Sequence, residues 1–401
     1  MLGPPPKARA SKLVLRHVLV GTLHEPTIAT TELRPTRLEV DLAQLAENYR
    51  AIARFAPTAQ VMPILKANAY GHGLVPVARM LEALGAPLVG VAYLEEALRL
   101  REEGVRMPVL VLGGIVGEQI PLFLEHDLTL TASSIDKLRA IEEHAAAMKT
   151  TATVHLKIDT GMERIGVHWY SAEKLLEASL GCRHVNVEGI FTHFASADEE
   201  DLTHARLQLE RFHEVLRFYE KRSLPTPLRH AANSGAIVQL PESHLDLVRP
   251  GILFYGARPA PHIPDVVPVR GALRWVTRVV YFKVVLPGNG VSYGSIWRPD
   301  AQTRLVTLPV GYGDGYPRAL SGRAEVMLGG RRHPLVGRVC MDQVMVSIGA
   351  DGSAYNGDEA VLLGDGITVE ELAAWAGTIP HDILAGINTR VPRVYVGRPT
   401  A

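Results

Sequence analysis

The chain has 401 residues, and its 42 lysine and arginine residues balance 42 aspartate and glutamate residues, so the formal charge is zero. Proteins that bind nucleic acids usually carry a basic excess, and this balance argues against an acidic polymer as the partner. Hydrophobic residues make up 47% and charged residues 21% of the chain, which excludes a disordered chain and is typical of a globular protein with a large core.

The N-terminus is not typical of a secretory signal. Residues 1–11 are rich in proline and basic residues, and polar residues interrupt the apolar stretch 12–21, whereas a signal needs an unbroken apolar run before its cleavage site. No apolar run reaches the length of a membrane span, and the two cysteines lie too far apart for a disulfide framework or a metal cluster. We expect a cytoplasmic protein without membrane contacts or metal, in which residues 1–36 form an extension and a strand.

Short apolar runs alternate with helical patterns through the first two thirds of the chain. Helices are expected at 41–55, 74–84, 93–103, 134–148 and 204–223, with Asp41 and Ser134 as N-caps. Strands are expected at 61–65, 88–92, 109–112, 128–131, 153–158, 187–191, 229–231 and 247–248. Eight strands alternating with helices predict a TIM-type (β/α)₈ barrel over 37–273. A doubly wound open sheet has the same alternation and is the rival architecture.

The pattern changes after about residue 273. Segments rich in β-branched residues, separated by Gly and Pro turns, lie at 275–286, 304–310, 324–328, 334–348 and 359–363. One helix is expected at 368–376. Strands in series that are joined by turns favour a mainly antiparallel β domain over 274–401, and the stretch 30–40 is a candidate to pair with it.

The segment 64–73, ILKANAYGHG, places Lys66 at the C-terminal end of an apolar strand. In a barrel, that end of the strands carries the active site. A lysine that leaves a buried strand can lose its proton and form an imine with an aldehyde, and Gly71 and Gly73 allow the backbone to approach a ligand closely. A lysine at the barrel rim beside an ordinary turn has the same pattern, so spacing alone leaves both interpretations open.

This lysine segment resembles the cofactor-lysine motif of the alanine racemase family. Eight further segments resemble motifs of that family in the same order, at 157–166, 191–195, 230–234, 249–252, 291–294, 311–316, 338–343 and 392–395. The resemblance covers about 38–396. It implies a pyridoxal 5'-phosphate (PLP) enzyme that interconverts L-alanine and D-alanine and supplies D-alanine for peptidoglycan. It also implies a homodimer, in which the β domain contributes to the active site of the partner subunit.

The resemblance implies a two-base mechanism. Lys66 would hold the cofactor and, once freed, act as a base on one face of the α-carbon, with Tyr293 from the partner subunit on the other face. A phenol has a pKa of about 10, so Tyr293 needs the positive neighbours that a chain through His193 and Arg249 would supply. Taken singly, His193 is typical of a core histidine and Tyr293 of a surface aromatic residue.

Arg249 has a second implied role, facing the pyridine nitrogen of the cofactor. An arginine does not readily give up its proton, so the ring nitrogen would stay unprotonated and the carbanion short-lived, which disfavours side reactions. The alternative for Arg249 is a structural arginine in a solvent-exposed ion pair.

The remaining implied residues bind the cofactor and the substrate. The phosphate group would be held by Tyr70, Ser234, the backbone N–H groups of Gly251 and Ile252, and Tyr395. The substrate carboxylate would be held by Arg164 and by the backbone N–H of Met341. Arg164 and His193 would also contact the cofactor. Tyr312 would narrow the entrance opposite Tyr395. Lys157 would carry a carbamate that holds Arg164, with an unmodified lysine in an ion pair as the alternative.

Other functions share much of this pattern. A serine or broad-specificity racemase would have nearly the same residues, and some activity on serine is expected because a small hydroxyl is poorly rejected. A PLP-dependent decarboxylase is disfavoured because those enzymes resemble a design in which a carboxylate faces the pyridine ring. A non-enzymatic PLP-binding protein of this kind would lack the β domain.

Overall fold

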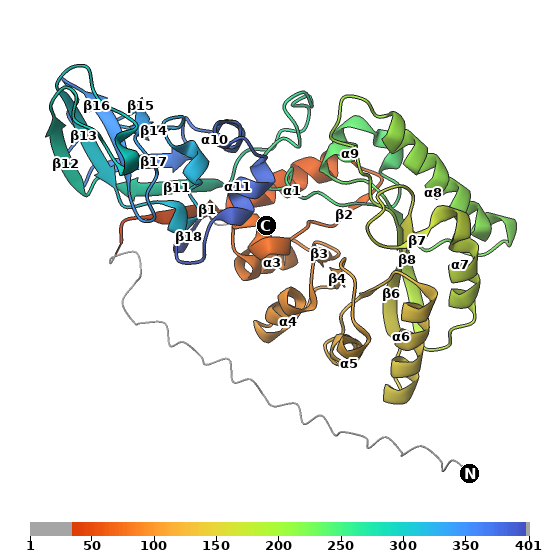
Figure 1. Cartoon of the computed structure of the whole chain (residues 1–401). Coiled ribbons are helices and arrows are strands. Elements are labelled where there is room, and N and C mark those ends of the chain that lie inside the picture. The colour runs from red at the N-terminus through yellow and green to blue at the C-terminus, as the bar shows by residue number, and fades with distance from the viewer. Residues whose placement is uncertain (1–33, 398–401) are drawn as a thin grey trace, which may run out of the picture.

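The computed structural model describes residues 34–397. The extension expected over residues 1–33 lies outside the described residues. The described chain folds into a ring of strands wrapped by helices, followed by a β-rich unit that lies beside it (Figure 1). One continuous core of buried apolar side chains runs through both units.

Eight short strands form a closed parallel ring. They are β2 (Gln60–Val61), β3 (Val89–Val91), β4 (Val109–Val111), β5 (Leu130–Ala132), β6 (Ala152–Asp159), β8 (Val185–Phe191), β9 (Leu228–His230) and β10 (Leu247–Val248). Parallel ladders join β10 to β2, β3 to β4, and β5 through β6 and β8 to β9. Isolated parallel bridges join Ile64 to Gly90 and Leu110 to Thr129, and the backbone of Arg249 donates to Ala232 O at 2.9 Å. The predicted (β/α)₈ barrel is confirmed, and closure of the ring excludes the open sheet.

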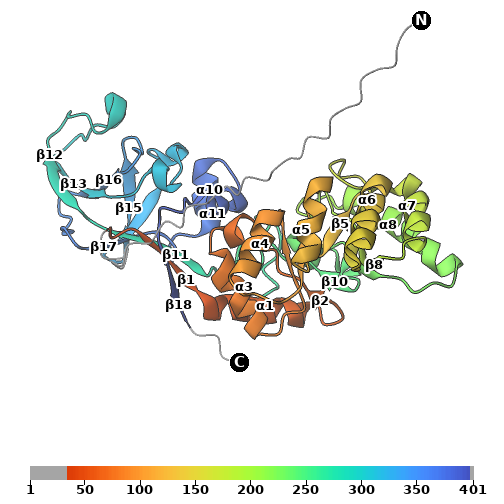
Figure 2. The same cartoon turned by 90° about the horizontal axis from the view of Figure 1, so that it is seen from below.

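Helices cover the outside of this barrel, as Figure 2 shows. They are α1 (Leu42–Phe55), α3 (Leu74–Ala83), α4 (Leu94–Glu102), α5 (Ile120–Glu125), α6 (Ile135–Met148), α7 (Ala172–Leu180), α8 (Thr203–Lys221) and α9 (Ser234–Gln239). The predicted N-caps are confirmed, because Asp41 accepts from the Gln44 N–H and Ser134 from the Lys137 N–H. The helices α5, α7 and α9 were not predicted; α5 and α9 have six residues each, too few for a sustained 3.6-residue period.

The β-rich unit is built on one nine-stranded sheet with the order β12-β13-β16-β15-β14-β17-β11-β1-β18. The strands are β1 (Arg37–Asp41), β11 (Leu273–Arg278), β12 (Tyr281–Val285), β13 (Thr303–Leu308), β14 (Glu325–Leu328), β15 (Arg331–Val336), β16 (Val344–Gly349), β17 (Glu359–Leu363) and β18 (Arg393–Val396). All ladders are antiparallel except β1 with β18, so the expected antiparallel character is confirmed.

Two of the strands expected in this unit are each divided. The segment 275–286 forms β11 and β12, which pair with different neighbours, and a break at residues 279 and 280 separates them. The segment 334–348 is interrupted by the loop 337–343, which leaves the sheet between β15 and β16. A continuous apolar sequence does not reveal such breaks, because it does not show which strand pairs with which.

Two helices join the sheet to the barrel. The predicted helix is α10 (Val369–Ala376), capped by Thr368, and a second helix, α11 (Pro380–Gly386), was not predicted. The chain after α11 reaches the turn behind Lys66, where Arg393 Nε donates to Gly71 O at 3.0 Å. A Cβ added to Gly71, whose φ is +80°, would lie 2.3 Å from Leu384 O in α11. The glycine is therefore required for this close approach.

Within residues 34–397, no helix is both long enough and apolar enough to cross a membrane.

Candidate active site

A cavity of about 510 Å³ opens at the C-terminal ends of the barrel strands. Most of the residues singled out from the sequence line it, namely Lys66, Tyr70, Lys157, Arg164, His193, Ser234, Arg249, Gly251 and Ile252. They come from the ends of five barrel strands, β2, β6, β8, β9 and β10, so only closure of the barrel brings them together. Four expected residues do not line this cavity: Tyr293, Tyr312, Met341 and Tyr395.

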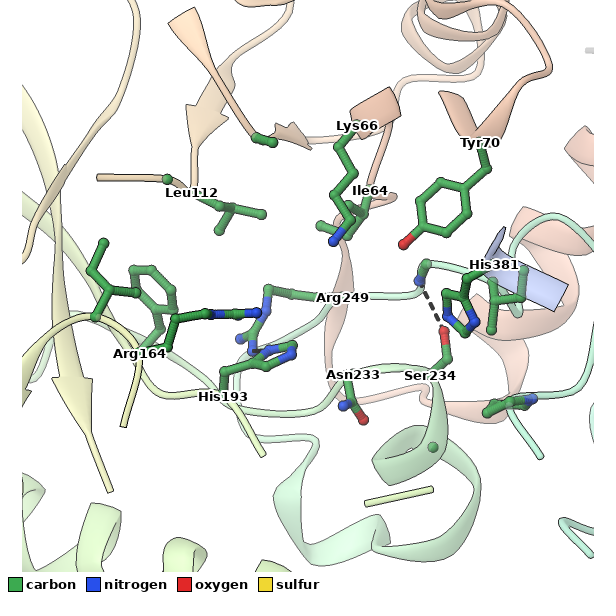
Figure 3. A pocket seen from close by; sticks show the side chains of 18 of the residues that line it. Ile64, Lys66, Tyr70, Leu112, Arg164, His193, Asn233, Ser234, Arg249 and His381 are labelled. Carbon is green, nitrogen blue, oxygen red and sulfur yellow. Dashed lines mark hydrogen bonds between the residues drawn. The ribbon is translucent and has the colours of Figure 1, made fainter. Parts of the chain in front are cut away.

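Lys66 begins the short turn α2 (Lys66–Tyr70), and its amine points into the middle of the cavity (Figure 3). Burial and the charge of Arg164 lower the pKa of the Lys66 ammonium, while Glu96 opposes this shift. A lysine whose pKa is lowered is more readily deprotonated near neutral pH, and a neutral amine is the form that attacks an aldehyde. The lysine therefore has the chemistry needed to hold an aldehyde-bearing cofactor.

Arg249 lies buried at the floor of the cavity, with neutral acceptors around its guanidinium. Its Nη2 donates to Thr192 O at 2.7 Å and to Ala231 O at 2.8 Å, and its Nη1 lies 2.9 Å from His230 Nδ1. None of the partners of the Arg249 guanidinium among the described residues is a carboxylate. Burial lowers the pKa of Arg249 to about 9, so at neutral pH this is a buried cation held without an anion in direct contact.

A chain of two histidines connects Arg249 to an acidic residue on β8. His230 Nε2 lies 2.7 Å from His155 Nδ1, and His155 Nε2 lies 3.0 Å from a carboxylate oxygen of Glu188. Because Arg249 can only donate, His230 must accept on Nδ1 and carry its proton on Nε2. His155 must then donate from Nε2 to Glu188. Burial and the charge of Arg249 lower the pKa of His230 well below its ordinary value, which keeps this histidine neutral.

His193 occupies the other side of Arg249. Its Nδ1 lies 3.3 Å from Arg249 Nη2, and burial together with the Arg249 charge lowers the pKa of His193 well below its ordinary value. A neutral imidazole that accepts on Nδ1 has its proton on Nε2 and can donate it away from the arginine. The predicted link between His193 and Arg249 is therefore present in the structure.

Lys157 is a buried lysine at the end of β6. Its amine donates to Ile158 O at 3.0 Å and lies 5.1 Å from the ring centre of Phe191. Burial, with the charges of Arg249 and Arg164 added, lowers the pKa of Lys157 to about 7. A substantial fraction of this amine is therefore neutral at neutral pH, which is the state that reacts with carbon dioxide.

The end of the cavity that Ser234, Gly251 and Tyr70 line carries neutral hydrogen-bond donors. The Ser234 hydroxyl accepts from the N–H groups of Gly251 at 2.9 Å and Leu253 at 3.3 Å, so its own proton is directed elsewhere. A Cβ on Gly251 would lie 2.7 Å from the Tyr70 hydroxyl, which shows how closely these groups surround one small space. Burial raises the pKa of Tyr70 to about 12 and keeps it a donor.

His381 of α11 lines the same end, and the sequence analysis missed it. Its ring lies 5.9 Å from the ring of Tyr70, and Figure 3 shows it among the side chains that line the cavity. Its pKa is lowered by burial and by the charge of Lys66. The only local signal was a histidine behind a proline in an unpredicted helix, which indicates nothing by itself.

Tyr395 lies elsewhere than the sequence analysis expected. It belongs to β18, and its hydroxyl fills the space in which a Cβ of Gly73 would sit. The tyrosine therefore packs behind the turn that follows Lys66, and it neither lines the cavity nor stands opposite Tyr312 there.

Tyr293, Met341 and Tyr312 lie on the β-rich unit of the same chain. Tyr293 and Met341 line a second hollow of about 1220 Å³ on the sheet. Their side chains are 71% and 53% exposed, and Tyr312 is 43% exposed. The Tyr312 N–H donates to Cys340 O at 3.0 Å, which holds the loop of Tyr312 against that of Met341.

A buried carboxylate fixes these two loops. Asp314, with no exposed surface, accepts from the Gly311 N–H at 3.0 Å and from Arg390 Nε at 2.7 Å. Arg390 also donates to Asp342 Oδ1 at 2.7 Å, which ties the loop of Asp342 to the same arginine. Tyr312 and Met341 are thus held together by hydrogen bonds, and neither lines the cavity of its own chain.

Comparison with known proteins identifies two matching families. Residues 40–259 match the family described as alanine racemase, N-terminal domain, and residues 272–395 match alanine racemase, C-terminal domain. The alanine racemase of Carboxydothermus hydrogenoformans is 45% identical over 91% of this chain and 100% of its own, and that of Symbiobacterium thermophilum is 42% identical over 91% and 98%.

Solved structures agree with these matches. The alanine racemase of Streptomyces lavendulae superposes with a TM-score of 0.86 at 38% identity, covering 91% of this chain and 98% of its own. That of Clostridium difficile 630 has a TM-score of 0.85 at 34% identity, covering 90% and 96%.

Proposed function

The chain belongs to the alanine racemase family of PLP-dependent isomerases, and from this premise we propose that it interconverts L-alanine and D-alanine with Lys66 and Tyr293 as the two bases. The observation that carries the proposal is the position of Lys66, whose amine points into a cavity lined by the cations Arg164 and Arg249. The family supplies D-alanine, and we assign that role, in the cytoplasm, to this protein.

The residues of the cavity fit PLP. Ser234, Tyr70 and the close-packed Gly251 form a donor-rich end for a phosphate group, and Arg249 lies at the other end for the pyridine ring. We propose that His381, rather than Tyr395, completes the phosphate end, because His381 lines the cavity and Tyr395 does not. When bound, PLP supplies the electron-withdrawing ring that allows the Cα–H bond of an amino acid to ionise.

The protein residues divide the remaining tasks. Arg249 donates to two backbone carbonyl groups and to His230. It keeps its own proton, so it does not protonate the ring nitrogen of the cofactor. Lys66, once its amine is free, takes or returns the α-proton on its own face. Arg164 binds the substrate carboxylate, with the Met341 N–H of the partner subunit beside it.

We propose a homodimer in which each subunit supplies Tyr293 to the cavity of the other. In the single chain Tyr293 is exposed and lines the hollow of the sheet rather than the Lys66 cavity. Exposed apolar residues line the same hollow, including Tyr281, Val284 and Met341, and such a patch is typical of a protein interface. The same surface would bring Tyr312 to the entrance of the partner's cavity.

Carbon dioxide is expected to modify Lys157. The neutral amine attacks carbon dioxide, a new N–C bond forms, one proton leaves, and the resulting carbamate anion can hold the guanidinium of Arg164. We expect protein kept in bicarbonate to carry the mass of one carbon dioxide per chain, and ¹³C-labelled bicarbonate to give a carbamate NMR signal that Lys157→Ala lacks.

The same substitution should slow racemisation about 100-fold, because a misplaced arginine disturbs substrate alignment. The exposed Lys174, changed to alanine, is the matched control. A label that persists in Lys157→Ala, or an unlabelled protein with full activity, would contradict the carbamate.

The proposed function is tested by incubating the purified protein with PLP and L-alanine in deuterated water. We expect D-alanine that carries deuterium on the α-carbon, detected by chiral chromatography and mass spectrometry. A protein that binds PLP but forms no D-alanine would overturn alanine as the substrate. The same assay on serine, lysine and arginine would then separate another racemase from a decarboxylase, which releases carbon dioxide, and from a cofactor carrier, which does neither.

A further inference from the structure

The carboxylate of Glu96 joins the turn behind Lys66 to the start of α4. One oxygen, Oε1, accepts from the backbone N–H of Ala67 at 2.7 Å. The other, Oε2, accepts from the N–H groups of Ala92 at 2.8 Å and Tyr93 at 3.3 Å. Glu96 thus holds three backbone donors that come from two loops at neighbouring strand ends.

The turn that Glu96 holds has an unfavourable backbone. Four successive residues after Lys66, from Ala67 to Tyr70, have φ between 49° and 56°, and none of them is glycine. In this left-handed conformation the Cβ of an L-residue crowds its carbonyl oxygen, so such residues rarely occur in series. Contacts from outside must therefore maintain the turn.

Several side-chain contacts hold this turn among the described residues. Asn68 Oδ1 accepts from the Leu74 N–H at 2.9 Å, His72 Nδ1 lies 2.9 Å from Tyr70 O, and Arg393 Nε donates to Gly71 O at 3.0 Å. Of these side chains and Glu96, Glu96 is the one that bonds to Ala67, the first residue after Lys66. Loss of that bond would remove the side-chain contact that lies nearest to Lys66 along the chain.

Glu96 also contributes a negative charge near the Lys66 amine. The charged and titratable groups that act on Lys66 from the surrounding elements are Arg164, His193, His381 and Glu96. Of these, only Glu96 is acidic. It offsets the repulsion between Lys66 and Arg164, which come from different strand ends.

We propose that Glu96 is a positioning residue for Lys66: its carboxylate holds the Ala67 N–H and so fixes the left-handed turn that presents the lysine amine to the cofactor aldehyde. This inference rests on the proposed role of Lys66. Glu96 does not line the cavity, and it acts only through the backbone and through its charge.

Four variants separate this role from simple capping of α4. Glu96→Ala removes the carboxylate, and Glu96→Gln keeps its size without the charge. Glu96→Asp keeps the charge at the start of α4 but is one methylene too short to reach Ala67 as well. Glu95→Gln removes the charge of an exposed neighbour in the same helical turn and is the matched control.

Each full-length variant is freed of PLP and titrated with it, and binding is followed by the visible absorbance of the PLP–lysine adduct. Thermal unfolding of the PLP-free protein is measured alongside. We expect Glu96→Ala and Glu96→Asp to weaken PLP affinity about 10- to 100-fold, as for loss of a hydrogen bond to a charged group. We expect Glu96→Gln to fall between them and the wild type, and Glu95→Gln to match the wild type.

The pH profile gives an independent readout. The pH–rate profile of racemisation has a limb that follows deprotonation of Lys66. In Glu96→Gln this limb should move to lower pH, because the negative charge that stabilises the Lys66 ammonium is lost. Capping alone would not move it.

Wild-type PLP affinity and an unshifted pH profile in Glu96→Ala and Glu96→Asp would overturn the inference, even if both proteins unfolded more easily. If the wild type forms the Lys66 adduct, verified by borohydride reduction and peptide mapping, but does not racemise alanine, the proposed function fails and the titration still decides the role of Glu96. If PLP is bound without Lys66, both proposals fail.

Discussion

Lys66→Ala is expected to abolish the visible absorbance of protein-bound PLP and to reduce racemisation by at least about 1,000-fold. The substitution removes the one amine that points into the middle of the cavity, and with it both the covalent anchor and a base. Lys157, the other lysine lining the cavity, is held against Ile158 O and the ring of Phe191 and should not replace it. Racemisation is measured by chiral analysis and adduct formation by absorbance.

Two companion variants sharpen this test. Lys66→Arg keeps a positive charge, but a guanidinium that stays protonated cannot hold the aldehyde, so it should be as inactive as Lys66→Ala. The exposed Lys174, changed to alanine, should leave both readouts unchanged. Near-normal turnover in Lys66→Ala would show that the assignment of Lys66 is wrong.

Tyr293→Phe should lower racemisation by about 100- to 10,000-fold, as for loss of a general acid or base, while PLP binding stays normal. The physical reason is that the substitution removes only a hydroxyl, from a residue that does not line the cavity of its own chain. Tyr293 would act on one face of the α-carbon. The rate of α-proton abstraction should therefore fall more when one alanine enantiomer is the substrate than when the other is. Exchange of that proton in deuterated water, started from each enantiomer in turn, measures the asymmetry.

Mixed dimers test whether Tyr293 acts in the partner's cavity. When Lys66→Ala and Tyr293→Phe chains are produced together, a hybrid dimer has one site with both defects and one site with none. Random pairing should then restore about one quarter of wild-type activity, although each variant alone is nearly inactive. If the mixture stays inactive while hybrid dimers form, Tyr293 does not act across the interface. A parallel loss of bound PLP in Tyr293→Phe would make the residue structural.

Local patterns were sufficient for most of the fold. All eight barrel strands were located, most of them from apolar runs, because strands buried in a parallel barrel are largely apolar. The caps of α1 and α6 were recognised from single residues, because Asp41 and Ser134 bond to amides only three residues away. The helix α11 was not predicted: it has only seven residues, and its proline occupies the first turn, where proline is compatible with a helix.

The site was predicted less evenly. The adjacent strand and glycines made Lys66 a candidate, and the family resemblance decided between its two interpretations and supplied the roles of residues such as Arg249. That resemblance placed the phosphate contact of the C-terminal unit at Tyr395, whereas His381 lines the cavity instead. Nothing in the sequence near position 381 indicates that its side chain meets Tyr70, which lies more than 300 residues earlier.

The sequence by itself therefore determined which segments become strands and helices, where the lysine leaves its strand, and which residue types are present for the chemistry. Those features depend on periodicity, caps and turns, which act over a few residues. Only the tertiary structure decided which polar groups meet: His155 with His230 and Arg249, Glu96 with Ala67, and His381 with Tyr70. Contacts of this kind depend on closure of the barrel and on packing of α11 against it, and no local pattern records how distant segments are brought together.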